Sequence, residues 1–229
     1  MCLWHINGLD LYKMILNRCE VNLCSHIVFP DQIQTILLYR SPKCLSNLFC
    51  QDLLFLENLI FFKEAITNED LDYLQHFPNL KFLEINRCKA VTDISSLPQC
   101  ENLRSLNFLS KPGYLIAGSC RGIKKLTKLQ HIHVSWNCIK PWDLLKLVNL
   151  EMLELNHIQY YDECAMNEIL QASSKLRQVR FRQVNTKFPR KFPAFPHIEF
   201  SFGCGYQDKF ELPKGDEYFA GNLFGAEDH

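Results

Sequence analysis

Several side chains that could bind or react gather between residues 131 and 182. They comprise histidines, arginines, a tryptophan, a methionine and a glutamate, namely His131, His133, Trp136, Met152, Glu154, His157, Arg180 and Arg182. Exposed aromatic residues and arginines supply much of the binding energy at protein interfaces. If the fold places this set on one surface, we expect it to be the principal contact site for another protein. The alternative interpretation is a mixed polar surface with no such centre.

A second group consists of four cations spaced at nearly equal intervals in the first 90 residues, namely Arg18, Arg40, Lys63 and Arg87. A fold that stacked these positions on neighbouring strands would hold the charges about 5 Å apart along one rim. Like charges in such a row repel each other, so an acidic patch on a protein partner would stabilise them. The alternative interpretation is a charged edge that only water solvates.

Two kinds of chemical site compete with these contact surfaces. His131 and His133 would share one face of a strand, and Glu154 and His157 would lie on the next strand, as metal ligands could. Cys138 follows the histidines as a conceivable nucleophile, but its position favours a buried structural thiol. The phosphate-loop, serine-hydrolase and zinc-protease motifs are all missing. We therefore predict no catalytic residue, no metal, no cofactor and no enzymatic activity.

The charge balance argues against two classes of partner. The 229 residues carry 25 Lys+Arg and 25 Asp+Glu, which gives a formal net charge of zero. Broad nucleic-acid binding needs a basic field, so a nucleic-acid partner is not expected. No unbroken apolar run approaches the roughly 20 residues of a membrane-spanning helix, so no membrane partner is expected either. No small-molecule substrate is evident.

The cysteines and the first residues bear on localisation. The 11 cysteines are an odd number without any C-x-x-C pair, which favours reduced thiols over a disulfide framework. Asp10 and Lys13 interrupt the first apolar stretch, and no small-residue cleavage site follows it, so no signal peptide is expected. These features predict a cytoplasmic or nuclear protein.

A repeating apolar pattern runs along the chain and would position the groups above. The triplet apolar-x-x-apolar-x-apolar recurs nine times, at starts separated by 19 to 26 residues. The starts are Leu11, Ile33, Leu56, Leu80, Leu103, Leu129, Leu150, Leu176 and Phe195. The last two apolar residues of each triplet are two apart and so face the same side of a strand. One such strand cannot bury its face alone, so the copies are predicted to stack as a parallel sheet.

The clearest copies are NLKFLEINRC (79–88), NLRSLNFLS (102–110), KLQHIHVSWNCI (128–139) and NLEMLELNHI (149–158). They resemble the leucine-rich repeat family, whose pattern L-x-x-L-x-L-x-x-N/C-x-L is complete from Leu129 to Ile139. Residues 90–103 resemble its short repeats, whereas 66–80 and 162–176 resemble its helix-bearing repeats. The resemblance implies an α/β solenoid: a curved horseshoe with a parallel β-sheet on the concave face and short helices and loops on the convex face.

The resemblance also implies an organisation and a role. Residues 1–202 would form an array of about eight or nine units, best defined over 53–184, and 203–229 would form a C-terminal cap and tail. The side chains between the apolar anchors would point from the concave face, where both groups of candidate residues would lie. The implied function is non-enzymatic protein–protein recognition, as an adaptor or a sensing module. The alternatives are the ligand-sensing or substrate-recognition end of a larger innate-immunity receptor or ubiquitin-ligase complex, or an enzyme inhibitor.

Overall fold

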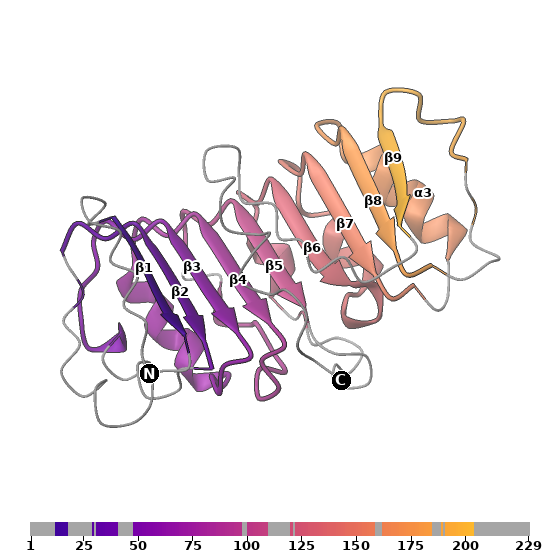
Figure 1. Cartoon of the computed structure of the whole chain (residues 1–229). Helices are drawn as coiled ribbons and strands as arrows, with labels where there is room; N and C mark the ends of the chain where they lie inside the picture. Colours follow the sequence, from indigo (N-terminus) through magenta and orange to yellow (C-terminus); the bar gives the residue numbers. More distant parts are fainter. Residues whose placement is uncertain are drawn as a thin grey trace.

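Nine strands form one open, parallel sheet, and their order in space is their order in the chain (Figure 1). The computed structural model describes residues 12–17, 29, 31–40, 48–97, 100–109, 120, 122–158, 162–184, 189 and 191–203. The strands are β1 (Lys13–Asn17), β2 (Thr35–Tyr39), β3 (Asn58–Phe62), β4 (Phe82–Asn86), β5 (Ser105–Leu109), β6 (His131–Ser135), β7 (Met152–Asn156), β8 (Gln178–Arg182) and β9 (Glu199–Gly203). Each predicted triplet therefore supplies one strand.

The strand register follows the triplets. Leu83 pairs with Leu106, which pairs with Ile132, and Ile132 pairs with Leu153 on the next strand. All eight neighbouring pairs are parallel, so the prediction of a parallel sheet is confirmed. Parallel neighbours require a crossover of a dozen or more residues, and the spacing of the triplets leaves room for one after each strand.

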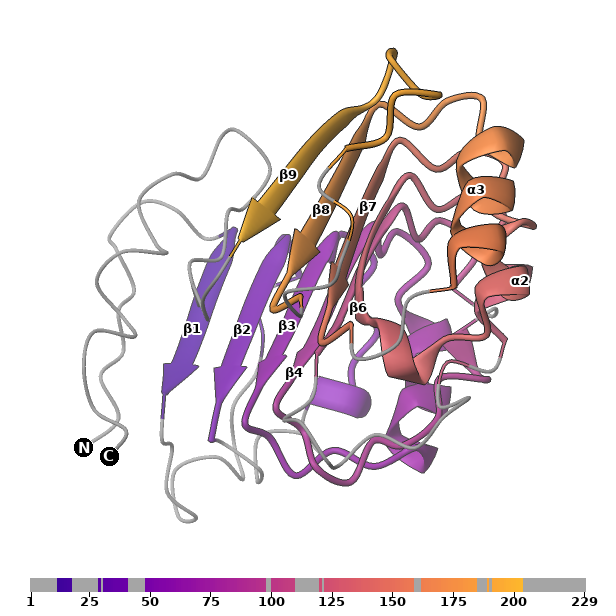
Figure 2. The ribbon, with the colours of Figure 1, turned by 90° about the vertical axis from the view of Figure 1, so that its right-hand side faces the viewer.

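One face of the sheet carries the main hydrophobic core, which contains the second and fourth residues of the strands. In β5, for example, Leu106 is 0% exposed and Phe108 is 1% exposed. Figure 2 shows the helices on this side of the sheet, within the segments that return the chain from one strand to the next. They are η2 (Glu69–His76), η4 (Ile123–Lys125), η5 (Trp136–Cys138), α2 (Pro141–Leu144) and α3 (Glu163–Ala172).

The two segments predicted to bear helices differ in helix type. In 162–176, the Asp162 carboxylate accepts a hydrogen bond from the Ala165 amide at 3.0 Å and caps the α-helix α3. In 66–80, η2 is a 3₁₀ helix instead. Its buried Leu71 and Leu74 are three residues apart, which matches the three residues per turn of a 3₁₀ helix.

A ladder of asparagines joins the turns that lead into successive strands. The side-chain amides of Asn79, Asn102 and Asn149 donate to backbone carbonyls of the preceding turn, at 2.6, 2.8 and 2.8 Å. Each asparagine stands directly before the first leucine of a triplet. These bonds satisfy carbonyl groups that no strand pairs, and they fix the spacing of the turns at one edge of the sheet.

The structure bears on two further expectations and leaves two untested. Across the described ranges, no helix is both long and apolar enough to cross a bilayer. The cysteines Cys88, Cys100, Cys120 and Cys138 are buried free thiols, whereas Cys50 and Cys164 are exposed free thiols, so the predicted burial of Cys138 is confirmed. Arg18 and residues 204–229, the greater part of the predicted cap and tail, lie outside the described residues.

Candidate functional site

The first, third and fifth residues of each strand point away from the main core, because side chains alternate along a strand. We call the surface that they form the open face. On β6, β7 and β8 it is a grid in which His131, Met152 and Gln178 form one row. The next rows are His133, Glu154 and Arg180, then Ser135, Asn156 and Arg182. The structure thus brings six of the eight residues predicted between 131 and 182 onto one surface. His157 directly follows β7 at its end.

The centre of this grid is the carboxylate of Glu154, whose side chain is only 8% exposed. Arg182 Nε donates to Glu154 Oε1, and Arg180 Nη1 lies 3.8 Å from Oε2. His133 Nε2 lies 3.1 Å from Oε1, without hydrogen-bond geometry. A carboxylate that has lost most of its hydration needs such cations, and in turn it holds the arginines in fixed positions. The predicted contact residues therefore form a preorganised ionic cluster.

Two histidines of the site have perturbed proton affinities. Burial lowers the pKa of His133 below its ordinary value of 6.5, although Glu154 and Asn156 act to raise it. Burial also lowers the pKa of His157. Desolvation disfavours the charged imidazolium, so both side chains favour the neutral form near pH 7. The fixed positive charge of the cluster therefore comes from the two arginines.

The prediction that Trp136 is an exposed contact residue is wrong, since its side chain is 6% exposed and belongs to the main core. The residue after the strand has a left-handed backbone at five equivalent places, with φ between 49° and 56°: Arg40, Lys63, Arg87, His157 and Gln183. After β6 the chain instead enters the 3₁₀ helix η5 at Trp136. This different turn carries the indole into the core and away from the rim.

The left-handed turn places the predicted basic residues in a row, of which Arg40, Lys63 and Arg87 are described. Their charged groups lie over aromatic rings of the open face, Arg40 over Tyr39 at 5.5 Å and Arg87 over Phe62 at 5.7 Å. Lys63 Nζ lies 5.7 Å from the Tyr39 ring centre and 5.6 Å from that of Phe62. The rings themselves are stacked with centroids 5.3 Å apart. Cation–π attraction therefore offsets part of the repulsion expected from the row.

Sequence reasoning missed a second buried carboxylate on the open face. Glu84 is 3% exposed and accepts hydrogen bonds from the side-chain amides of Asn86 at 3.0 Å and Asn107 at 3.2 Å. Glu84 and Asn107 are register partners on β4 and β5. The sequence did contain a signal for this contact, because Glu84 and Asn107 occupy the same position in consecutive triplets. Through its register partner Asn107, Glu84 lies in the same row of the open face as His133 and Glu154.

The alternative sites gain no support from their geometry. Cys138 is 1% exposed, and burial raises the pKa of its thiol to about 12, so its thiolate is scarce near pH 7. Within the ranges that the structure describes, no group of three or more His, Cys, Asp or Glu side chains could hold a metal ion.

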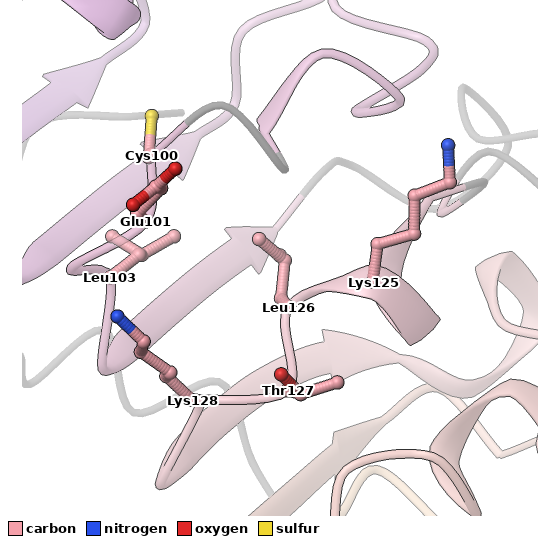
Figure 3. Close-up of a pocket in the computed structure, with 7 residues that line it drawn as sticks. All are labelled: Cys100, Glu101, Leu103, Lys125, Leu126, Thr127 and Lys128. Carbon is pink, nitrogen blue, oxygen red and sulfur yellow. The ribbon is translucent and has the colours of Figure 1, made fainter.

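A surface pocket lies away from these residues, at the turns that precede β5 and β6 (Figure 3). It is lined by Cys100, Glu101, Leu103, Lys125, Leu126, Thr127 and Lys128. Its ionisable side chains Glu101, Lys125 and Lys128 are exposed, and burial raises the pKa of the Cys100 thiol to about 12. A hydrated acid and a protonated thiol do not make an activated nucleophile.

Comparison with known proteins gives no family for the chain. No protein-family model matches it, and no curated protein matches it.

Proposed function

We propose that this chain is a leucine-rich repeat protein and that its open face binds another protein. The observation that carries the proposal is the ionic cluster around Glu154, which fixes two arginines on a broad sheet surface. Arginines held in place before binding lose little side-chain entropy when a partner arrives. Arginine is also among the residues that most often dominate interface energies.

The details of the repeat support the family. In the family pattern, Asn or Cys follows the strand, and Cys88 occupies that place after β4. Its thiol donates to the backbone carbonyl of Phe61 on the preceding strand at 3.7 Å. A side chain that ties each turn to the strand before it would stabilise a stack of similar coils, and the asparagine ladder would act in the same way at the opposite ends of the strands.

The chemistry of the face favours recognition over catalysis. Its two buried carboxylates are each satisfied by donors from this chain, Glu84 by amides and Glu154 by arginines. A side chain that acts as a general acid or base must be free to exchange a proton with a substrate. A surface of arginines, imidazoles and a thioether side chain is better suited to complement a polar protein surface that carries carboxylates.

The test is affinity capture by the full chain, followed by measurement of the dissociation constant of the captured partner. Arg180→Ala removes a guanidinium from the open face and is expected to weaken binding by roughly ten- to a hundredfold. Arg177→Ala is the matched control, because Arg177 is exposed and precedes β8 outside the open face. The proposal fails if Arg180→Ala binds as tightly as the wild type, or if only Arg177→Ala weakens the complex.

A further inference from the structure

The open face of the first strands carries a second, separate hydrophobic cluster. Leu37, Ile60 and Phe82 form it, and Ile15 and Tyr39 pack against it. Although these three residues lie on the face opposite the main core, they are 8%, 4% and 5% exposed. The corresponding rows of β6 to β8 hold the histidines, arginines and Glu154. The open face is therefore apolar at one end and ionic at the other.

The described part of the chain places no helix over this cluster, because the helices lie on the other side of the sheet (Figure 2). A cluster of aliphatic and aromatic side chains on a sheet face is costly to hydrate, and such clusters mark places where another surface binds. The low exposure of Leu37, Ile60 and Phe82 fits a face that has a cover.

The charges around the cluster restrict what can cover it. Arg40, Lys63 and Arg87 stand along its rim, at the ends of β2, β3 and β4. The Glu84 carboxylate on this face is already bonded to two amides. A covering segment should therefore combine large apolar side chains with carboxylates that can meet the rim.

Residues 204–229 of this chain have that composition. They contain seven large apolar side chains, Tyr206, Phe210, Leu212, Tyr218, Phe219, Leu223 and Phe224. They also contain six acidic residues and two lysines, which gives a net charge of −4. Because the whole chain is neutral, residues 1–203 carry the balancing +4. The segment and the rim thus have opposite charges.

The segment is also long enough. It begins after β9, six strands from β3, and six strand spacings amount to about 29 Å. Its 26 residues span up to roughly 86 Å when extended. It can cross the open face and still have residues left to lie against several strands.

We propose that residues 204–229 bind in cis over the apolar cluster on β2, β3 and β4, with their carboxylates toward Arg40, Lys63 and Arg87. This cover occupies the apolar half of the open face and leaves the ionic half free. The inference does not depend on the proposed function. It adds that a partner that uses the apolar half must first displace the chain's own acidic segment.

The test uses the full chain with a photo-crosslinking benzoylphenylalanine in place of Tyr39, which is half-buried beside the cluster. The same replacement at Trp142, which is 49% exposed in α2, is the control. After irradiation, peptide mapping should find residues 204–229 joined to position 39 in a product of monomer mass, and not joined to position 142. Links from position 39 only to other segments, or only in a product of dimer mass, would overturn the proposal.

A second measurement tests the role of charge. Arg40→Glu with Lys63→Glu should lower the yield of the cross-link by roughly fivefold, whereas Lys124→Glu with Lys128→Glu should leave it unchanged. If the rim variant does not fold, Asp216→Asn with Glu217→Gln makes the same test from the segment. An unchanged yield in the folded variant would contradict the pairing of these charges.

Discussion

The clearest prediction distinguishes a buried tryptophan from an exposed one. Trp136 is 6% exposed within the main core, and Trp142, six residues later, is 49% exposed. Truncating a buried tryptophan removes a large apolar contact and leaves a cavity, so Trp136→Ala should destabilise the protein by about 3–5 kcal/mol. Trp142→Ala removes a side chain that water already reaches, and it should cost less than about 1 kcal/mol.

Urea unfolding, followed by far-ultraviolet circular dichroism, measures the difference without relying on tryptophan fluorescence. With a slope of about 2.5 kcal/mol per molar urea, the midpoint of Trp136→Ala should fall by roughly 1–2 M. The midpoint of Trp142→Ala should move by less than roughly 0.5 M. Equal midpoints for the two variants would show that Trp136 is not a core residue, and would restore it as a candidate contact residue.

Three further predictions concern the ionic cluster and the thiols. Glu154→Gln leaves two arginines without their carboxylate and should lower the free energy of unfolding by about 1–3 kcal/mol. The control Glu199→Gln, at an exposed position, should change it by less than about 0.5 kcal/mol. Similar losses for the two variants in urea titrations would contradict the stabilising role of the ionic cluster. Because the folded pKa of His133 lies below 6.5, the unfolded chain binds more protons. Stability should be full above pH 6.5 and should fall as the pH drops toward the folded pKa, and His133→Gln should flatten that fall in urea titrations at several pH values. An alkylating reagent should modify the exposed Cys164 in the native protein but should modify Cys138 only after denaturation. Peptide mass spectrometry would identify the modified cysteines. Rapid labelling of Cys138 in the native protein would contradict its burial.

The sheet could be predicted from the sequence because its determinants are local and repeated. Each triplet fixes which residues of a strand face the core, and nine copies in tandem leave little choice of strand order. Even the weakest copy, which starts at Phe195, forms a strand, β9. The sequence placed a helix in both 66–80 and 162–176 without separating their types, and the structure has the 3₁₀ helix η2 in the first and the α-helix α3 in the second.

The site could be predicted only in part, because a residue's exposure depends on the turn that carries it. Trp136 occupies the same place in its triplet as Arg87 and His157, yet those two have left-handed backbones and Trp136 begins a 3₁₀ helix. The pattern of apolar residues does not encode that choice. The pairing of Glu154 with Arg180 and Arg182, and its contact with His133, depend on the neighbours across the sheet, so they became visible only with the register.

The measurement that tests the account most directly is the spacing of equivalent turns in solution. Leu54, Thr127 and Ser174 are exposed residues of the turns before β3, β6 and β8. Spin labels carried by noncanonical amino acids at these positions should report distances that grow with strand number, by about 5 Å per strand. The backbone separations should be roughly 14 Å from Leu54 to Thr127 and roughly 24 Å from Leu54 to Ser174. A Leu54–Ser174 distance equal to or shorter than the Leu54–Thr127 distance would contradict the sequential parallel sheet on which the open face depends.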